Sequence, residues 1–78
     1  MSNVKYQIIV HHLASGVTYR SIIIESSEED LDDTKNLLNK AAASQLTYLE
    51  FEGQDDNNYI IPDLVLQQSV ITLKIIKE

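Results

Sequence analysis

The chain has 78 residues, no cysteine and a formal net charge of -6 at pH 7. This length predicts one domain spanning 1–78, and without disulfides a domain this small needs a metal or self-association as extra stabilisation. With no apolar run long enough for a membrane span and no secretory leader, the composition predicts a cytoplasmic protein with no membrane partner.

The first elements are expected to form a β-hairpin. Alternating side chains from Val4 to His11 predict a strand with one more apolar face. Gly16 can supply the positive φ that a short loop requires. The β-branched and aromatic residues of 17–25 then predict a second strand.

A helix is expected to follow. Ser26 lies three residues before Glu29, which is the S-x-x-E spacing of a capping box, so the helix should begin at Ser26. One stripe of residues, mostly apolar, recurs at helical spacing: Leu31, Leu38, Ala41, Ala42 and Gln45. The stripe predicts an amphipathic helix of about 18 residues that covers one face of a sheet.

The C-terminal half is predicted to form three further strands. They are expected at 47–52, ended by Gly53, at 58–61, stopped by Pro62, and at 69–76, while residues 63–68 fit either a helical turn or an extended crossing. The order β-β-α-β-β-β predicts an α+β fold, with an antiparallel sheet of four to five strands and one helix on one face.

Apolar residues on both sides of several strands predict self-association. Adjacent isoleucines such as Ile8 with Ile9 and Ile60 with Ile61 point to opposite faces, whereas one helix covers a single face. Each exposed Ile or Val would forgo roughly 1.5–3 kcal/mol of burial. A second copy is therefore expected to cover the open face or a sheet edge, and a sheet curled into a partial barrel is the alternative.

The candidate catalytic and metal-binding residues favour a protein that is not an enzyme. His11 and His12 are neighbours in a strand and point apart, so they do not converge on a metal. The acidic helix start and the 53–58 turn lack the ligand spacing of calcium loops, so no metal is expected. Nucleotide-binding and nucleophile motifs do not occur. Glu50 and Glu52 would lie about 7 Å apart on one strand face, but so small a domain leaves little room for a substrate cleft. We therefore expect no enzyme activity and no cofactor.

The segregated charge suggests a partner. The stretch from Glu25 to Asp63 holds eleven acids against two lysines, a charge of -9, whereas the rest of the chain carries +3. Such a field repels nucleic acid and favours a basic protein surface. The leading hypothesis is a homodimeric or larger binding module that occupies or inhibits a protein partner. Its expected contact residues are acidic: Glu28, Glu29, Asp32, Asp33, Asp55 and Asp56.

Two other functions stay open. The first is a pocket between subunits that binds or sequesters a nucleotide-like anion, with Tyr19 or Tyr48 stacking on a base and Arg20 or Lys74 reaching phosphate. The second is a structural subunit of a larger assembly. Neither the ligand nor the stoichiometry follows from the sequence.

The C-terminal segment also suggests a family. Residues 56–62, which read Asp-Asn-Asn-Tyr-Ile-Ile-Pro, are followed by Leu64 and the strand residues 69–73. This arrangement resembles the strand-Pro-strand ending of small phage-encoded accessory proteins. The resemblance carries over no site residue. It implies a compact non-enzymatic protein that works by occupancy, either blocking a host factor or holding a small signal molecule away from its receptor.

Overall fold

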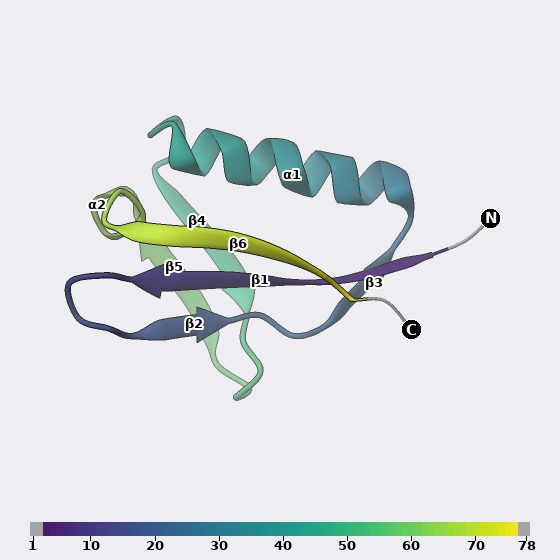
Figure 1. The fold of residues 1–78 in the computed structure, drawn as a ribbon, viewed down its shortest axis with the longest axis horizontal. Coiled ribbons are helices and arrows are strands. Elements are labelled where there is room, and N and C mark those ends of the chain that lie inside the picture. The colour runs from purple at the N-terminus through teal and green to yellow at the C-terminus, as the bar shows by residue number, and fades with distance from the viewer. Residues whose placement is uncertain (1–2, 77–78) are drawn as a thin grey trace.

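The computed structural model describes residues 3–76 and confirms the α+β class with antiparallel pairing. A four-stranded and a two-stranded sheet are formed, with the main helix after the third strand (Figure 1). The elements are β1 (Val4–His12), β2 (Thr18–Arg20), β3 (Ile24–Ser26), α1 (Glu28–Ala42), β4 (Tyr48–Glu52), β5 (Asn58–Pro62), α2 (Asp63–Leu66) and β6 (Ser69–Ile76). The last strand has its predicted bounds, and the open segment 63–68 contains the short helix α2.

Strand β1 is the centre of the larger sheet. β6 pairs with it along the whole stretch from Lys5 to His12, and β2 and β3 pair with successive parts of its other side. Every pairing is antiparallel. The register places three pairs on the inner face of the sheet: Tyr6 with Ile75, Ile8 with Leu73, and Val10 with Ile71.

The prediction of one continuous strand over 17–25 is wrong at residues 21–23. Arg20 lies opposite Ile9, but Ile24 lies opposite Tyr6, so residues 21–23 face only residues 7 and 8 of β1. One extra residue in a strand makes a β-bulge, which interrupts the ladder and bends the strand. The expected single strand is therefore divided into β2 and β3.

The predicted start of the helix at Ser26 is also wrong by one residue. Ser26 still pairs with Val4 in β3, so its backbone belongs to the sheet. Ser27 is the N-cap of α1, and its side-chain oxygen accepts a hydrogen bond from the backbone N–H of Asp30 at 3.2 Å. Pairing with β1 therefore extends the strand to Ser26 and leaves the next serine to cap the helix.

The chain itself supplies two covers for the inner face of the larger sheet. α1 lies along one side, and the β4–β5 hairpin crosses behind the sheet (Figure 1). The hairpin joins the sheet edge through the bridge between Ser21 and Gly53 and through the hydrogen bond from Ile22 N–H to Glu52 O at 2.9 Å. The buried core draws on every layer: Tyr6, Ile8, Val10, Leu31, Leu38, Ala41, Leu49, Phe51, Ile61 and Leu66.

Large apolar side chains nevertheless remain at the surface. Leu64 is 81% exposed, and Leu13 and Ile60 are more than 60% exposed. Among residues 3–76, no helix has the length and apolar character that a membrane crossing requires. The cytoplasmic location and the oligomeric state stay predictions.

Candidate functional site

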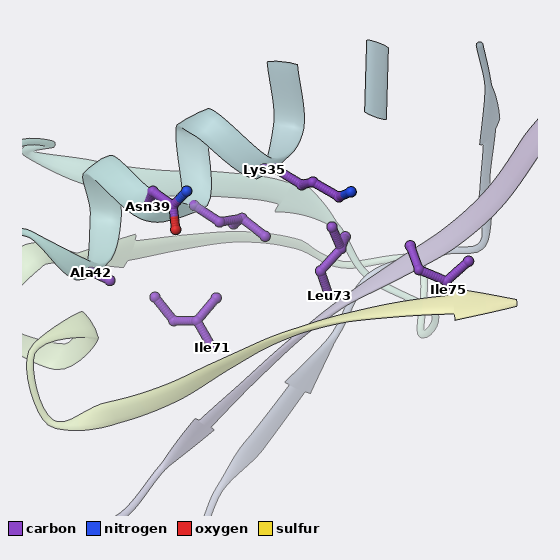
Figure 2. A pocket seen from close by; sticks show the side chains of 7 residues that line it. Lys35, Asn39, Ala42, Ile71, Leu73 and Ile75 are labelled. Carbon is purple, nitrogen blue, oxygen red and sulfur yellow. The ribbon is translucent and has the colours of Figure 1, made fainter. Parts of the chain in front are cut away.

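A groove with a volume of about 390 Å³ runs between α1 and β6. In Figure 1, α1 lies along β6 on the side away from β1. Figure 2 shows Ile71, Leu73 and Ile75 pointing from the strand toward the helix, with Lys35 reaching out along the rim. Leu38, Asn39 and Ala42 complete the lining from the helix side. The groove is therefore apolar along its strand wall and polar only at its helix rim.

The free edge of β6 borders this groove. In the described chain, β6 pairs with β1 and with no strand on its other side. Backbone direction follows from β1, where Ile8 exchanges hydrogen bonds with Ser21 and therefore points its N–H and C=O away from β6. Since successive residues of a strand point their backbone groups to alternate sides, Lys5, Gln7, Ile9 and His11 bond to β6.

The same alternation assigns the outer edge of β6. Thr72 and Lys74 lie opposite Ile9 and Gln7, so they direct their backbone groups toward β1. Ile71, Leu73 and Ile75 consequently direct theirs to the free edge. Their side chains face the groove, so each offers backbone hydrogen bonds and apolar surface at one place.

Two other sheet edges in residues 3–76 are less open. The β2–β3 side is interrupted by the bulge, and its middle is occupied by hydrogen bonds from Ile22 to Glu52 and from Gln54 to Arg20. β5 has five residues and ends at Pro62. A short strand with a proline is a poor template for pairing, whereas β6 has eight residues and no proline.

Two lysines, Lys35 and Lys74, lie beside the groove, although the chain is acidic overall. Lys35 lies 3.9 Å from Asp32 in an i,i+3 pair whose side chains are both more than half exposed. Lys74 is exposed on the outer face of β6, beside the free edge. Of these two lysines, Lys35 already has an acidic partner, so an incoming strand meets the charge of Lys74 beside the free edge.

A second, smaller hollow of about 140 Å³ lies where the hairpin tip meets β2. It is lined by Thr18, Arg20, Gln54, Asp55 and Tyr59. The Tyr59 hydroxyl donates a hydrogen bond to Asp55, which lowers the pKa of the carboxyl and raises the pKa of the phenol. Tyr59 also packs edge-on against Tyr19, with ring centroids 5.2 Å apart. The bond from Tyr59 to Asp55 and the backbone bond from Gln54 N–H to Arg20 O join the two sides of this hollow, which is consistent with a structural joint.

The six acidic residues expected to bind a partner fall into two separate places. Glu28, Glu29, Asp32 and Asp33 are exposed on the first half of α1. Asp55 and Asp56 lie in the turn between β4 and β5, at the opposite side of the molecule from the helix (Figure 1). The structure therefore does not join them into one acidic surface.

The four residues expected to bind a nucleotide-like ligand do not converge within one protomer. Tyr19 packs on Tyr59, and Arg20 borders the small hollow. Tyr48 pairs with Pro62 at the far end of the hairpin, and Lys74 lies on β6. A pocket between subunits stays a prediction.

The two histidines have separate structural partners. The His11 ring bonds to the Thr18 hydroxyl at 2.8 Å, and the His12 ring bonds to Ser15 and Gln68. Within the described residues, no group of three or more histidine, aspartate or glutamate side chains is placed to hold a metal ion.

Sequence reasoning missed the groove because it depends on which strand lies at an edge. The apolar alternation of Ile71, Leu73 and Ile75 was visible, and so was the helix stripe that contains Leu38. A pattern of side chains does not reveal which neighbour each strand takes. The long, proline-free strand 69–76 was the available signal of an open edge.

Comparisons of the chain with known proteins give no match to a family model, to a curated protein or to a solved structure. The resemblance to phage accessory proteins therefore stays a prediction. The function has to be inferred from the geometry of the groove.

Proposed function

We propose that this chain is a non-enzymatic binding module. It would bind a partner protein by pairing an extended segment of that partner, as an added strand, with the free edge of β6. Strand addition needs a free edge for main-chain hydrogen bonds and pockets for alternate side chains. The observation that carries the proposal is the coincidence of both at one place. Ile71, Leu73 and Ile75 line the groove, and by the register with β1 the same three residues direct their backbone groups to the free edge.

The position of α1 beside the edge supports the addition of a single partner strand, which we call the guest strand. An added strand lies about 4.8 Å from its neighbour, and its inward side chains stand roughly perpendicular to the sheet. On this side of β6, such side chains would contact Leu38 and Ala42 of α1. Main-chain pairing would supply affinity, and the groove would select apolar side chains at alternate positions.

A synthetic peptide tests this arrangement. The probe matches β6 in length, eight residues, and alternates valine with threonine. Its threonine nitrogens are methylated, so only the edge formed by the valines can pair. We expect it to shift the NMR signals of the Ile71, Leu73 and Ile75 amides and of Lys35 and Asn39, and to slow hydrogen exchange along β6. A control peptide methylated on every residue should do neither.

Proline substitution provides the matched test on the protein. The Ile75 N–H faces the free edge, so Ile75→Pro removes an outward donor without breaking the ladder to β1. Ile75 is 40% exposed, which limits the cost to the core. We expect Ile75→Pro to fold and to lose peptide binding, whereas Ile75→Ala should retain most of it. Equal binding by both variants, or signals shifted only outside the groove, would contradict strand addition.

Self-association is a second proposal, favoured by Leu64, Ile60 and Leu13 at the surface. These side chains do not line the groove. A second copy could therefore dock elsewhere while β6 holds its partner.

A further inference from the structure

We infer that the segment bound on β6 is apolar at its groove-facing positions and carries an acidic side chain opposite Lys74. This inference rests on the proposed strand addition and adds the chemistry of the partner. It concerns one position of the guest strand, which the register of β6 defines.

The register places Lys74 in close contact with the guest. In antiparallel pairing, residues opposite Ile71, Leu73 and Ile75 exchange hydrogen bonds with them. Residues opposite Thr72 and Lys74 form the non-hydrogen-bonded pairs, whose Cα atoms lie only about 4.5 Å apart. Their side chains stand on the outer face of the sheet. A carboxylate at the guest position opposite Lys74 is therefore within reach of the ammonium group.

The protein's own residues leave this cation available. Across β1, Lys74 lies opposite Gln7, which is 5% exposed and donates its Nε2 hydrogen to Ser21 O at 2.9 Å. Within residues 3–76, Lys5 pairs with Glu25 and Lys35 pairs with Asp32. Lys74 belongs to neither pair.

The charge of Lys74 itself favours an acidic guest, although the protein is acidic overall. Lys35 at the groove rim is already paired with Asp32, so Lys74 is the cation that a guest carboxylate would meet. Charges beyond about 8–10 Å are largely screened at physiological ionic strength, so the distant acidic turn at Asp55 and Asp56 contributes little here. Opposite charges directly across two strands stabilise pairing, whereas like charges oppose it.

A charge-swap experiment tests the inference. Two versions of the one-edged peptide carry glutamate or lysine in place of the threonine that lies opposite Lys74, and their affinities are measured by NMR titration at several salt concentrations. We expect the glutamate peptide to bind about two- to fivefold more tightly at low salt, which is the effect of one cross-strand ion pair. Lys74→Glu should reverse the preference. Lys40→Glu changes the net charge equally but lies on α1 outside the groove lining, so it should leave the preference unchanged.

The outcomes separate the inference from the proposed function. If both peptides bind the groove equally, or if Lys74→Glu and Lys40→Glu have the same effect, the acidic position is wrong and strand addition stands. If neither peptide shifts the β6 amides, strand addition itself is wrong. Reversal by Lys74→Glu alone supports both.

Discussion

The side-chain oxygen of Ser21 accepts a hydrogen bond from the backbone N–H of Ile8 at 2.8 Å. Ser21 is the first residue of the bulge and is fully buried. Its backbone N–H in turn donates to Ile8 O at 2.9 Å, and its hydroxyl donates to Ile22 O. One serine thus satisfies the backbone of β1 where the regular ladder between β2 and β3 is interrupted.

We expect Ser21→Ala to destabilise the fold. The substitution leaves the Ile8 N–H buried without its acceptor, which costs about 1–3 kcal/mol. Chemical denaturation of the variant would measure the loss. Ser26→Ala is a suitable comparison, because the Ser26 hydroxyl bonds only to the exposed carbonyl of Ser27. An equal effect of the two substitutions would contradict the role given to Ser21.

Ser27 and Ser26 provide a matched pair for the helix cap. Ser27→Ala removes the acceptor for the Asp30 N–H, and loss of an N-cap typically costs about 1 kcal/mol. Ser26→Ala should change the free energy of unfolding far less. If Ser26→Ala were the more destabilising change, the capping box expected from the sequence would be the correct assignment.

Gly53→Ala should disrupt the joint between the two sheets. A Cβ atom at this position would lie 2.4 Å from Cε2 of Tyr59 and 2.8 Å from Oδ1 of Asp55. Overpacking of this kind typically costs about 1–3 kcal/mol. Gly16→Ala is the control, because no atom lies within 4 Å of its Cβ and only its φ of +73° is strained. Thermal unfolding with near-UV circular dichroism would report the loss of tyrosine packing in Gly53→Ala.

The bond between Tyr59 and Asp55 predicts a pH dependence at both ends of the scale. The hydrogen bond from Tyr59 lowers the pKa of Asp55 below 3.8, so its contribution to stability is present above that value and is lost as the pH falls through the folded pKa. The bond to Asp55 raises the pKa of Tyr59 above 10.0, so this contribution is lost as the pH rises through the folded value. Tyr59→Phe should flatten both limbs of the stability profile. Unchanged limbs in denaturation curves of the variant would show that other groups are responsible.

Self-association can be measured by sedimentation equilibrium. We expect an average mass above 8.9 kDa that rises with protein concentration, because fully burying an Ile or Leu side chain is worth about 1.5–3 kcal/mol. Added salt should strengthen association by screening the net charge of -6 on each copy. The double variant Ile60→Ser with Leu64→Ser should weaken it more than Leu13→Ser, which lies in the β1–β2 turn. A monomer at every concentration would overturn the prediction.

The sequence predicted the elements whose side-chain pattern is local. The alternation in 69–76 predicted β6 with the correct bounds, and the stripe through Leu31, Leu38 and Ala41 predicted the buried face of α1. The break at Ser21 was not predictable from that pattern, because the isoleucines at 22–24 favour a continuous strand. The bulge follows only from the register of β2 and β3 with β1, which the side-chain pattern does not give. Ser26 and Ser27 both suit a cap, and pairing with Val4 decides between them.

The candidate site was less predictable. Charge segregation suggested one acidic surface, but chain direction carries the helix start and the hairpin turn to opposite sides of the molecule (Figure 1). The groove joins Leu38 to Leu73, residues that are far apart in sequence, and it depends on β6 lying at an edge. Of the ligand residues proposed from sequence, Lys74 alone borders this edge, and the role we propose for it differs from the phosphate contact expected from the sequence.

The pairing of β6 with β1 has a consequence for the timing of binding. These two strands are the first and the last in the described chain, and they form the longest ladder of the fold. During synthesis, the edge that would bind the partner strand forms only after Ile76 has left the ribosome and the intervening helix and hairpin have folded. A nascent or proteolytically shortened copy that lacks β6 would thus have no edge for the partner strand. Binding of the partner would therefore occur only after the chain had been synthesised and folded as far as β6.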